Sequence, residues 1–339
     1  MTKRLNITNG DGAAGVIRSS AVEGDILPWQ DLMFEGPFPA GLDLEATSQQ
    51  RAAYLAAAYP TDRDVAAEFQ ERDRLFGDAG RYDEIVLWFE HDLLDQLQLL
   101  QILDLFAGNR SASLDLICID DHPDVDEFRG LGQLLPRHLP ALLDARTPVT
   151  EKQFALAQAG WAAFRAPDPR EVETFLNGET SALPFLAPAL ARHFEEFPSA
   201  DTGLSRTDRQ LLDLVAAGRG DPLTLFLDNM AQETCLFMGD WSTFRRLAVL
   251  CEGATPLLRN RSGGPFRYPP RDRIDIDVFR LQRLALTKAG HEVLDGAADA
   301  ADLNPIDLWL GGVHLCDGAP LWRWDAESGR LMQTASPTP

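Results

Sequence analysis

Two apolar segments in the first third of the chain enclose one long leucine-rich helix pattern. Segments 84–89 and 113–119 are almost continuously apolar, as are strands that are buried on both faces. Between them, residues 92–106 repeat leucine at helical spacing, with Asp92 as the predicted N-cap and Gly108 as the predicted stop. A strand, a helix and a strand of these lengths form a parallel crossover. The chain is therefore expected to contain a parallel α/β sheet.

The 339 residues suffice for about two domains, and the patterns divide them into three parts. Residues 1–125 alternate strand and helix patterns, which predicts a Rossmann-like α/β domain. Residues 126–200 are mostly helical and interrupted by prolines, and we expect this helical region to pack on that domain. Residues 204–335 predict a winged-helix-like domain. The segment 198–203 is the predicted linker.

The prediction of a winged helix rests on the order of patterns in the C-terminal part. Three helices are predicted between Ser205 and Leu250, followed by a basic loop over 259–273. A strand over 279–286 and a terminal hairpin over 320–332 complete the pattern. Such a domain places basic side chains against a phosphate backbone. The residues expected to form this patch are Arg245, Arg246, Arg259, Arg261, Arg267, Arg271 and Arg273.

The formal net charge of −21 opposes most anionic partners. Its field repels phosphate backbones and anionic membrane surfaces at long range, so neither nucleic acid nor a membrane is the expected partner. No apolar run reaches the roughly 18–20 residues that a membrane span needs, and the N-terminus does not read as a signal peptide. These features predict a cytoplasmic protein. No CxxC pair occurs, so we expect free thiols rather than a zinc ribbon at Cys118, Cys235, Cys251 and Cys316.

Polar residues follow each predicted strand of the N-terminal domain. Ligand sites in open parallel sheets form beyond the carboxyl ends of the strands. We therefore expect these residues to converge at one edge of the sheet. In chain order they are Asn9, Gly10, Asp11 and Gly12, then Asp31 and Glu35, then Glu90, His91, Asp92, Asp95 and Gln96, and finally Asp120, Asp121 and His122.

Clustered carboxylates repel one another and need a metal, a cationic ligand or protonation. The pattern therefore predicts a metal-assisted hydrolase or transferase that acts on a small molecule or nucleotide. Asp11 and Glu90 would be metal ligands or acid–base groups, His91 a general base or ligand, and Asp92 the residue that orients it. The sequence does not identify the metal. The other predicted ligand-binding residues are Asn9, Gly10, Gly12, Glu35, Asp95, Gln96, Asp120 and His122.

Other interpretations of the same residues stay open. Acidic residues at strand–helix junctions are often plain N-caps, and Asp92 and Asp121 have such positions. The loop from Gly10 to Gly15 reads GxGxxG after a strand and before a helix, the context of a dinucleotide site. The carboxylate of Asp11 beside a pyrophosphate weighs against that alternative. A ligand-sensing regulator with a DNA- or protein-binding C-terminal half, or a plain interaction module, would also fit.

The chain resembles an uncharacterised bacterial family that is described as a domain of unknown function. The resemblance is carried by the NGD loop at 9–11, the EGP turn at 35–37, the WFEHD…DQLQLL block at 88–100, and the WLGGVHL and WRWD segments at 309–315 and 322–325. It covers most of the chain and implies an architecture without a reaction. In that family the NGD loop often continues with serine. The glycine that follows the loop in this chain therefore makes the GxGxxG match look accidental.

Overall fold

The computed structural model describes residues 3–108, 112–269 and 276–334. The chain divides into two compact units, Met1–Leu190 with Trp309–Val313, and Ala191–Leu308 with His314–Pro339. The three-part division and the cytoplasmic location stay predictions. Within the described residues, no helix combines the length and the apolar character that crossing a membrane requires.

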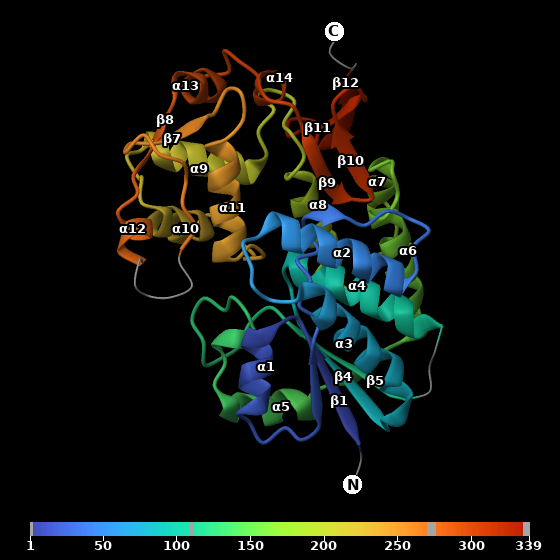
Figure 1. Cartoon of the computed structure of the whole chain (residues 1–339). Coiled ribbons are helices and arrows are strands. Elements are labelled where there is room, and N and C mark those ends of the chain that lie inside the picture. The colour runs from blue at the N-terminus through green and yellow to red at the C-terminus, as the bar shows by residue number, and fades with distance from the viewer. Residues whose placement is uncertain (1–2, 109–111, 270–275, 335–339) are drawn as a thin grey trace. The chain divides into compact units, whose positions relative to one another are not determined.

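The first unit is built on a five-stranded sheet in the order β2-β1-β4-β5-β6 (Figure 1). Strands β1 (Arg4–Thr8), β2 (Asp25–Pro28), β4 (Glu84–Glu90) and β5 (Ser113–Ile119) are parallel. The short strand β6 (Thr147–Pro148) runs antiparallel to β5. The predicted mixed α/β fold with a mostly parallel sheet is confirmed.

The sequence patterns explain the places of individual strands. All seven residues of β4 are buried, as its continuous apolar run predicts. Pro28 ends β2, and β2 lies at the edge of the sheet, where a residue without a backbone N–H removes no ladder hydrogen bond.

Helices cover both faces of this sheet (Figure 1). Val86 and Trp88 of β4 pack with Ile17 of α1, whereas Ile85 lines the same cavity as Phe106 of α4, so α1 and α4 lie on opposite faces. The helices of this unit are α1 (Asp11–Arg18), α2 (Leu44–Ala58), α3 (Val65–Gly77), α4 (Leu93–Ala107), α5 (Leu139–Asp144), α6 (Glu151–Phe164) and α7 (Arg170–Leu176). Short 3-10 helices span Asp78–Arg81, Leu131–Gln133 and Pro136–His138.

Helix α4 begins and ends where the sequence predicts. The Asp92 side chain accepts a hydrogen bond from the backbone N–H of Asp95, and Gly108 follows the last helical turn. Helix α6 packs closely on α4, because a Cβ at Gly160 would lie 3.1 Å from Leu100. The central crossover of the fold was therefore predictable from local sequence alone.

A C-terminal segment belongs to the first unit. Strand β3 (Gly36–Pro37) pairs in parallel with Leu310 and Gly311 of β9 (Asp307–Gly311). A Cβ at Gly312 would lie 1.9 Å from the backbone oxygen of Arg165, so only glycine fits there. The conspicuous WLGGV motif is therefore explained by close backbone packing.

The second unit contains a helical core, a two-stranded ribbon and a terminal hairpin. Ser205 caps α9 and Thr287 caps α13, because each side chain accepts a hydrogen bond from the backbone N–H three residues further on. The hairpin is confirmed by the antiparallel pairing of β11 with β12. Its helices are α9 (Arg206–Ala216), α10 (Pro222–Met230), α11 (Asp240–Leu250), α12 (Ile276–Arg280), α13 (Lys288–Leu294) and α14 (Ala300–Leu303). Its strands are β7 (Leu258–Asn260), β8 (Leu284–Leu286), β10 (Val313–Cys316), β11 (Leu321–Asp325) and β12 (Arg330–Thr334), while α8 (Leu186–Phe194) contains the sequence boundary between the units.

The predicted strand over 279–286 is wrong in its first half. Residues up to Arg280 belong to α12, and only Leu284–Leu286 form β8. Gln282 lies between α12 and β8 and belongs to neither. Its side chain accepts from the backbone N–H of Arg267 at 2.7 Å and donates to the backbone oxygen of Arg267 at 2.8 Å. This long-range contact has no local sequence signal.

The predicted basic patch is wrong in including Arg246. It is 9% exposed and pairs with Glu196 at 2.6 Å and Asp208 at 3.3 Å, so it cannot face a phosphate backbone. Arg271 and Arg273 lie outside the described residues. The four cysteines, all of which are described, form no disulfide.

Candidate functional site

The strand order creates a switch point between β1 and β4. From β1 the chain moves outward to β2, then returns past β1 to β4 and continues to β5. The loop after β1 leads to α1 on one face, and the loop after β4 leads to α4 on the other. Diverging loops of this kind leave a crevice outside the strand ends, which is where open α/β sheets bind ligands.

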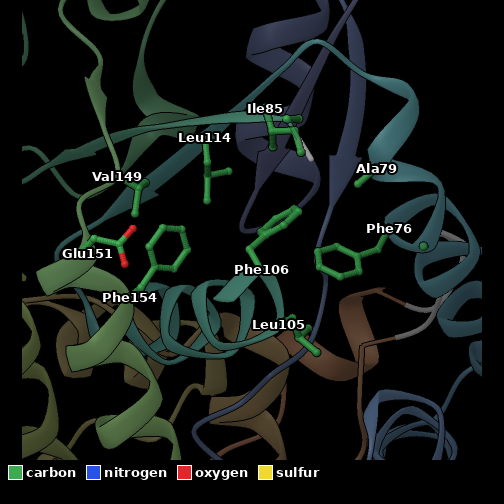
Figure 2. Close-up of a pocket in the computed structure, with 11 residues that line it drawn as sticks. Phe76, Ala79, Ile85, Leu105, Phe106, Leu114, Val149, Glu151 and Phe154 are labelled. Atoms are coloured by element: carbon green, nitrogen blue, oxygen red, sulfur yellow. The ribbon is translucent and has the colours of Figure 1, made fainter. Parts of the chain in front are cut away.

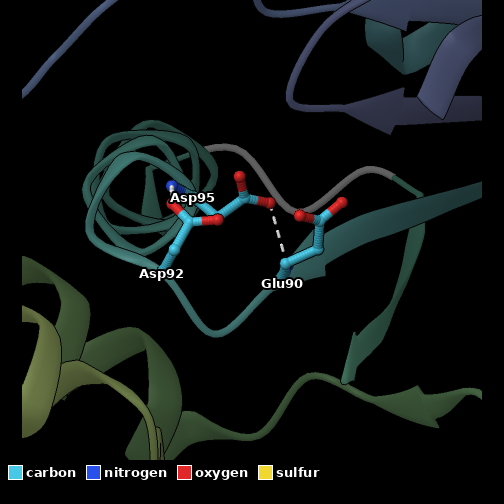
Figure 3. A group of neighbouring side chains, drawn as sticks. All are labelled: Glu90, Asp92 and Asp95. Carbon is cyan, nitrogen blue, oxygen red and sulfur yellow. Dashed lines mark hydrogen bonds between the residues drawn. The ribbon is translucent and has the colours of Figure 1, made fainter. Parts of the chain in front are cut away.

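Three carboxylates meet at this point: Glu90, Asp92 and Asp95 (Figure 3). One oxygen of each lies within 4.8 Å of the others. Glu90 and Asp92 are 4% exposed, and Asp95 is fully buried. The structure therefore brings together the predicted site residues of the β4–α4 junction.

Asn9 joins the cluster from the end of β1. Its side-chain amide donates to Asp95 Oδ2 at 2.8 Å and lies 3.4 Å from Glu90 Oε1. Asp95 Oδ1 in turn accepts from the backbone N–H of Glu90 at 2.8 Å (Figure 3). Since the two strand ends are more than 80 residues apart in sequence, the predicted convergence holds for the first and third loops.

A segment that sequence reasoning gave no role closes over Glu90. The backbone N–H of Leu131 donates to Glu90 Oε1. Gly130 has φ +151°, and a Cβ there would lie 2.4 Å from Glu90 Oε2. Glycine is therefore required at 130 on both conformational and steric grounds. The only available signal was the Gly-Leu-Gly run at 130–132.

Burial without a cation raises the pKa of each carboxyl group. Burial raises the pKa of Glu90 to about 8, with a further contribution from the charge of Asp92. Burial also raises the pKa of Asp92 to about 7, against the opposing effect of backbone N–H donors. The pKa of Asp95 is raised by burial and then by the charges of Asp92 and Glu90. None of the ion pairs among the described residues involves these carboxylates. Near neutral pH the cluster must therefore hold protons or a cation.

His91 follows Glu90 in the chain and lies near two aromatic rings. Its ring centroid is 6.3 Å from that of Phe128 and 6.1 Å from that of Phe185. Its Nδ1 is buried and has no hydrogen-bond partner among the described residues. An unsatisfied buried imidazole nitrogen costs free energy in the isolated protein, so it is a good position for a ligand contact.

Gln96 supports the site from α4. Its side-chain amide donates to the backbone oxygen of Glu90 at 2.6 Å and lies 3.4 Å from the sulfur of Cys118. Burial raises the pKa of the Cys118 thiol, so the thiol stays protonated near neutral pH. Gln96 therefore fixes the backbone of Glu90 by a buried hydrogen bond.

The remaining predicted site residues do not reach the cluster. Asp11 and Gly12 are exposed at the start of α1, and Asp120 is exposed after β5. His122 stacks on His138, with centroids 4.5 Å apart. No helix follows the exposed Asp121, so the interpretation of that residue as an N-cap is wrong.

Asp31 and Glu35 belong to a buried structural cluster instead. Asp31 pairs with Arg51 at 2.8 Å, and both side chains are at most 1% exposed. Arg51 also donates to the backbone oxygen of Glu35, whose carboxylate accepts from the hydroxyl of Tyr59. A Cβ at Gly36 would clash with Arg51, which accounts for the EGP turn.

At Gly10 and Gly15, the GxGxxG loop does not have the backbone geometry and close packing of a dinucleotide-binding loop. Gly10 has an extended backbone, with φ −174°. A Cβ at Gly10 or Gly15 would meet nothing within 4 Å. The glycines of a dinucleotide fingerprint are needed for a tight turn and for close helix–strand packing. Neither requirement is present in this loop.

A cavity lined mainly by apolar side chains lies at the end of the strands opposite the carboxylate cluster (Figure 2). Ile85 and Leu114, near the amino ends of β4 and β5, contribute to its wall. Phe76, Phe106 and Phe154 supply aromatic rings. The cavity is therefore separate from the carboxylate cluster at the carboxyl end of β4.

The chain matches no protein-family model and no curated protein. Its function must be inferred from the chemistry of its own residues. The features available are the switch point, the buried carboxylates of Glu90, Asp92 and Asp95, and the covering segment at Gly130 and Leu131.

Proposed function

We propose that the first unit binds a divalent cation through Glu90, Asp92 and Asp95 and acts on a small-molecule or nucleotide substrate as a metal-assisted hydrolase or transferase. The observation that carries this proposal is the buried, unpaired carboxylate cluster. Three carboxylates held together without a cationic side chain are destabilising, and a divalent ion reverses that effect.

The strand order supports a Rossmann-like assignment for this unit. Counting only the parallel strands, the spatial order is second, first, third, fourth. This order is similar to that of flavodoxin-like doubly wound sheets, whose ligands bind at the switch point between the first and third strands. The carboxylate cluster has that position.

The donor set suits a hard cation such as Mg²⁺ or Mn²⁺, which prefer carboxylate oxygen. Asp92 Oδ1 and both oxygens of Asp95 already accept hydrogen bonds from the protein. Those bonds orient the carboxylates and leave further lone pairs, together with Asp92 Oδ2 and Glu90 Oε2, for the ion. When bound, such an ion polarises a substrate oxygen or lowers the pKa of a water molecule.

The chain's own residues would complete the site. His91 is the proposed proton acceptor, because its unsatisfied ring nitrogen lies one residue from Glu90. Asn9 would keep the carboxylates of Asp95 and Glu90 in place by donating hydrogen bonds to both. The loop at Gly10 to Gly12 would offer backbone N–H groups at the start of α1 to an anionic substrate group.

The first test is metal binding. Protein purified without chelator would be studied by native mass spectrometry and elemental analysis, then titrated calorimetrically with MnCl₂. We expect one Mn²⁺ per chain in the wild type, and a loss of affinity of at least about tenfold in Glu90→Gln and in Asp95→Asn, since each removes a charged ligand. Glu90→Gln should keep the wild-type melting temperature or exceed it, because it relieves charge repulsion and keeps an oxygen that can accept from Leu131. Asp95→Asn should lower the melting temperature, because both oxygens of Asp95 accept hydrogen bonds and an amide can replace only one of them.

The matched control is Asp121→Asn, which removes an exposed carboxylate outside the cluster. It should bind Mn²⁺ as the wild type does. Equal Mn²⁺ binding in all four proteins, or none at millimolar concentration, would assign the cluster a purely structural role. His91→Ala should keep the metal but lose turnover once a substrate is found.

The second unit is proposed to be winged-helix-like. Helices α9, α10 and α11 precede the antiparallel β7–β8 ribbon, in the order that the sequence predicts. Leu258, Leu284 and Leu286 of the ribbon share a core with these helices. This shared core supports the assignment.

A further inference from the structure

Positive charge is concentrated in one part of this acidic chain. Residues 256–290 hold eight of its 31 lysine and arginine residues but only three of its 52 aspartate and glutamate residues. This segment includes the β7–β8 ribbon of the second unit. A local excess of this kind, against a net charge of −21, needs its own explanation.

Arginines occupy the outer face of the ribbon. Arg259 and Arg261 are exposed and alternate with the buried Leu258 and Asn260. The backbone N–H of Arg261 donates to the oxygen of Arg283 at 2.7 Å, which sets these two residues opposite each other. Since side chains alternate between faces along a strand, Arg259, Arg261 and Arg283 project from the same face.

A fourth arginine is held beside the ribbon by a buried amide. Gln282 is 5% exposed and bonds both the backbone N–H and the backbone oxygen of Arg267. Asn260 donates to the same Gln282 oxygen at 3.2 Å. The backbone of Arg267 is therefore fixed while its side chain stays exposed.

The acidic groups of the protein leave most of these charges unpaired. Within the described part of the chain, Arg259, Arg261 and Arg267 form no ion pair, and Arg283 has only Asp221, at 3.3 Å. Some exposed arginines elsewhere in the chain do have carboxylate partners, as Arg74 and Arg170 do. The ribbon thus carries three arginines without a carboxylate partner among the described residues, and a fourth, Arg283, with one partner.

We infer that this arginine ribbon, composed of Arg259, Arg261, Arg267 and Arg283, binds the phosphate backbone of duplex DNA. Guanidinium groups bind phosphate bidentately. A two-stranded antiparallel ribbon has the dimensions that the major groove admits. A duplex presents evenly spaced phosphates, which several arginines on one fixed backbone can contact together. The inference does not depend on the proposed metal site.

Binding is expected to be independent of sequence. The neighbouring helix α11 offers few polar side chains for base contacts, since Ser242, Thr243 and Arg246 are buried. Phosphate contacts position a protein without reading bases. The net charge of −21 opposes approach at long range, but screening over about 10 Å at 0.1 M salt limits this repulsion and leaves the short-range contacts of the patch with phosphate.

The test is fluorescence anisotropy of the full chain with a mixed-sequence duplex of about 20 base pairs at several salt concentrations. With four phosphate contacts, affinity should fall about 10²-fold between roughly 50 and 200 mM salt. The double variant Arg259→Glu/Arg261→Glu should weaken binding at about 50 mM salt by at least tenfold. It should also reduce the slope of log affinity against log salt by about 2.

The control is Arg74→Glu/Arg170→Glu, which changes net charge equally at exposed positions of the first unit. It should bind within about twofold of the wild type, and circular dichroism would establish that both double variants are folded. The inference is overturned by absence of binding at about 50 mM salt, or by equal losses in the two double variants. Binding to a single strand as tight as binding to the duplex would also overturn it.

Discussion

At the scale of single residues, the candidate site is defined by what surrounds Glu90. Its carboxylate receives the backbone N–H of Leu131 and the amide of Asn9, and it faces Asp92 and Asp95 without a cation. Donors that orient a carboxylate while leaving its charge unbalanced are typical of metal and acid–base sites. The residue that allows this packing is Gly130, because no other residue fits beside Glu90.

Gly130→Ala should therefore disturb the site itself. The positive φ and the 2.4 Å approach to Glu90 Oε2 predict a loss of about 1–3 kcal/mol in the free energy of unfolding. Because the new methyl group displaces Glu90, Mn²⁺ affinity should fall as well. Urea denaturation and calorimetric titration measure the two effects.

Gly132→Ala is the matched control, because a Cβ there meets its nearest atoms at 3.7 Å, an ordinary contact. It should change the free energy of unfolding by less than about 1 kcal/mol. A Gly130→Ala variant as stable as Gly132→Ala would mean that the segment over Glu90 is loosely held.

At the scale of elements, local patterns predicted what depends on local interactions. The β4–α4–β5 crossover, the Asp92 cap and the terminal hairpin follow from apolar spacing and capping chemistry. The first and third loops were predicted to converge, and Asn9 does reach Glu90 and Asp95.

Contacts between distant segments were not predictable in the same way. Asp31 was expected near the site, but a buried pair with Arg51 takes it elsewhere. Gln282 interrupts a predicted strand because it bonds Arg267. Leu131 closes over Glu90 from 41 residues away. In each case a polar side chain interacts with a residue that is distant in the sequence. The spacing of apolar residues along the chain does not predict such interactions.

The insertion of the C-terminal segment into the first unit gives an element-scale prediction. Gly312→Ala places a methyl group 1.9 Å from the backbone oxygen of Arg165, so backbone must move. We expect a loss of about 1–3 kcal/mol in the free energy of unfolding. Gly264→Ala, where a Cβ meets nothing within 4 Å, should be nearly neutral. Similar stability of the two variants in chemical denaturation would show that this segment contributes little.

At the scale of the whole molecule, charge sets how stability depends on pH. The net charge of −21 means that self-repulsion decreases as carboxylates are protonated. Against this trend, His193 in the second unit is 2% exposed, and burial lowers its pKa to about 4, with Arg192 adding to the effect and Glu196 opposing it. The Arg192 and Arg246 guanidinium groups hold the pKa of the buried Glu196 below its usual value.

The sign for His193 follows from its lowered pKa. An unfolded histidine titrates near 6.5, so between about pH 6.5 and 4 the unfolded chain binds a proton that the folded chain rejects. The stability that neutral His193 contributes is complete above pH 6.5 and is lost as the pH falls toward 4. This loss amounts to about 2–3 kcal/mol.

Replacing His193 by leucine isolates this contribution. All other titrating groups are shared by the two proteins, so the difference in unfolding free energy between His193→Leu and wild type reports position 193 alone. Relative to wild type, the variant should gain about 2–3 kcal/mol as the pH is lowered from 7 to 4. Urea denaturation at intervals of half a pH unit measures that difference. A difference that stays constant across this range would mean that His193 has the same pKa in the folded and the unfolded chain, and that the carboxylate of Glu196 offsets burial.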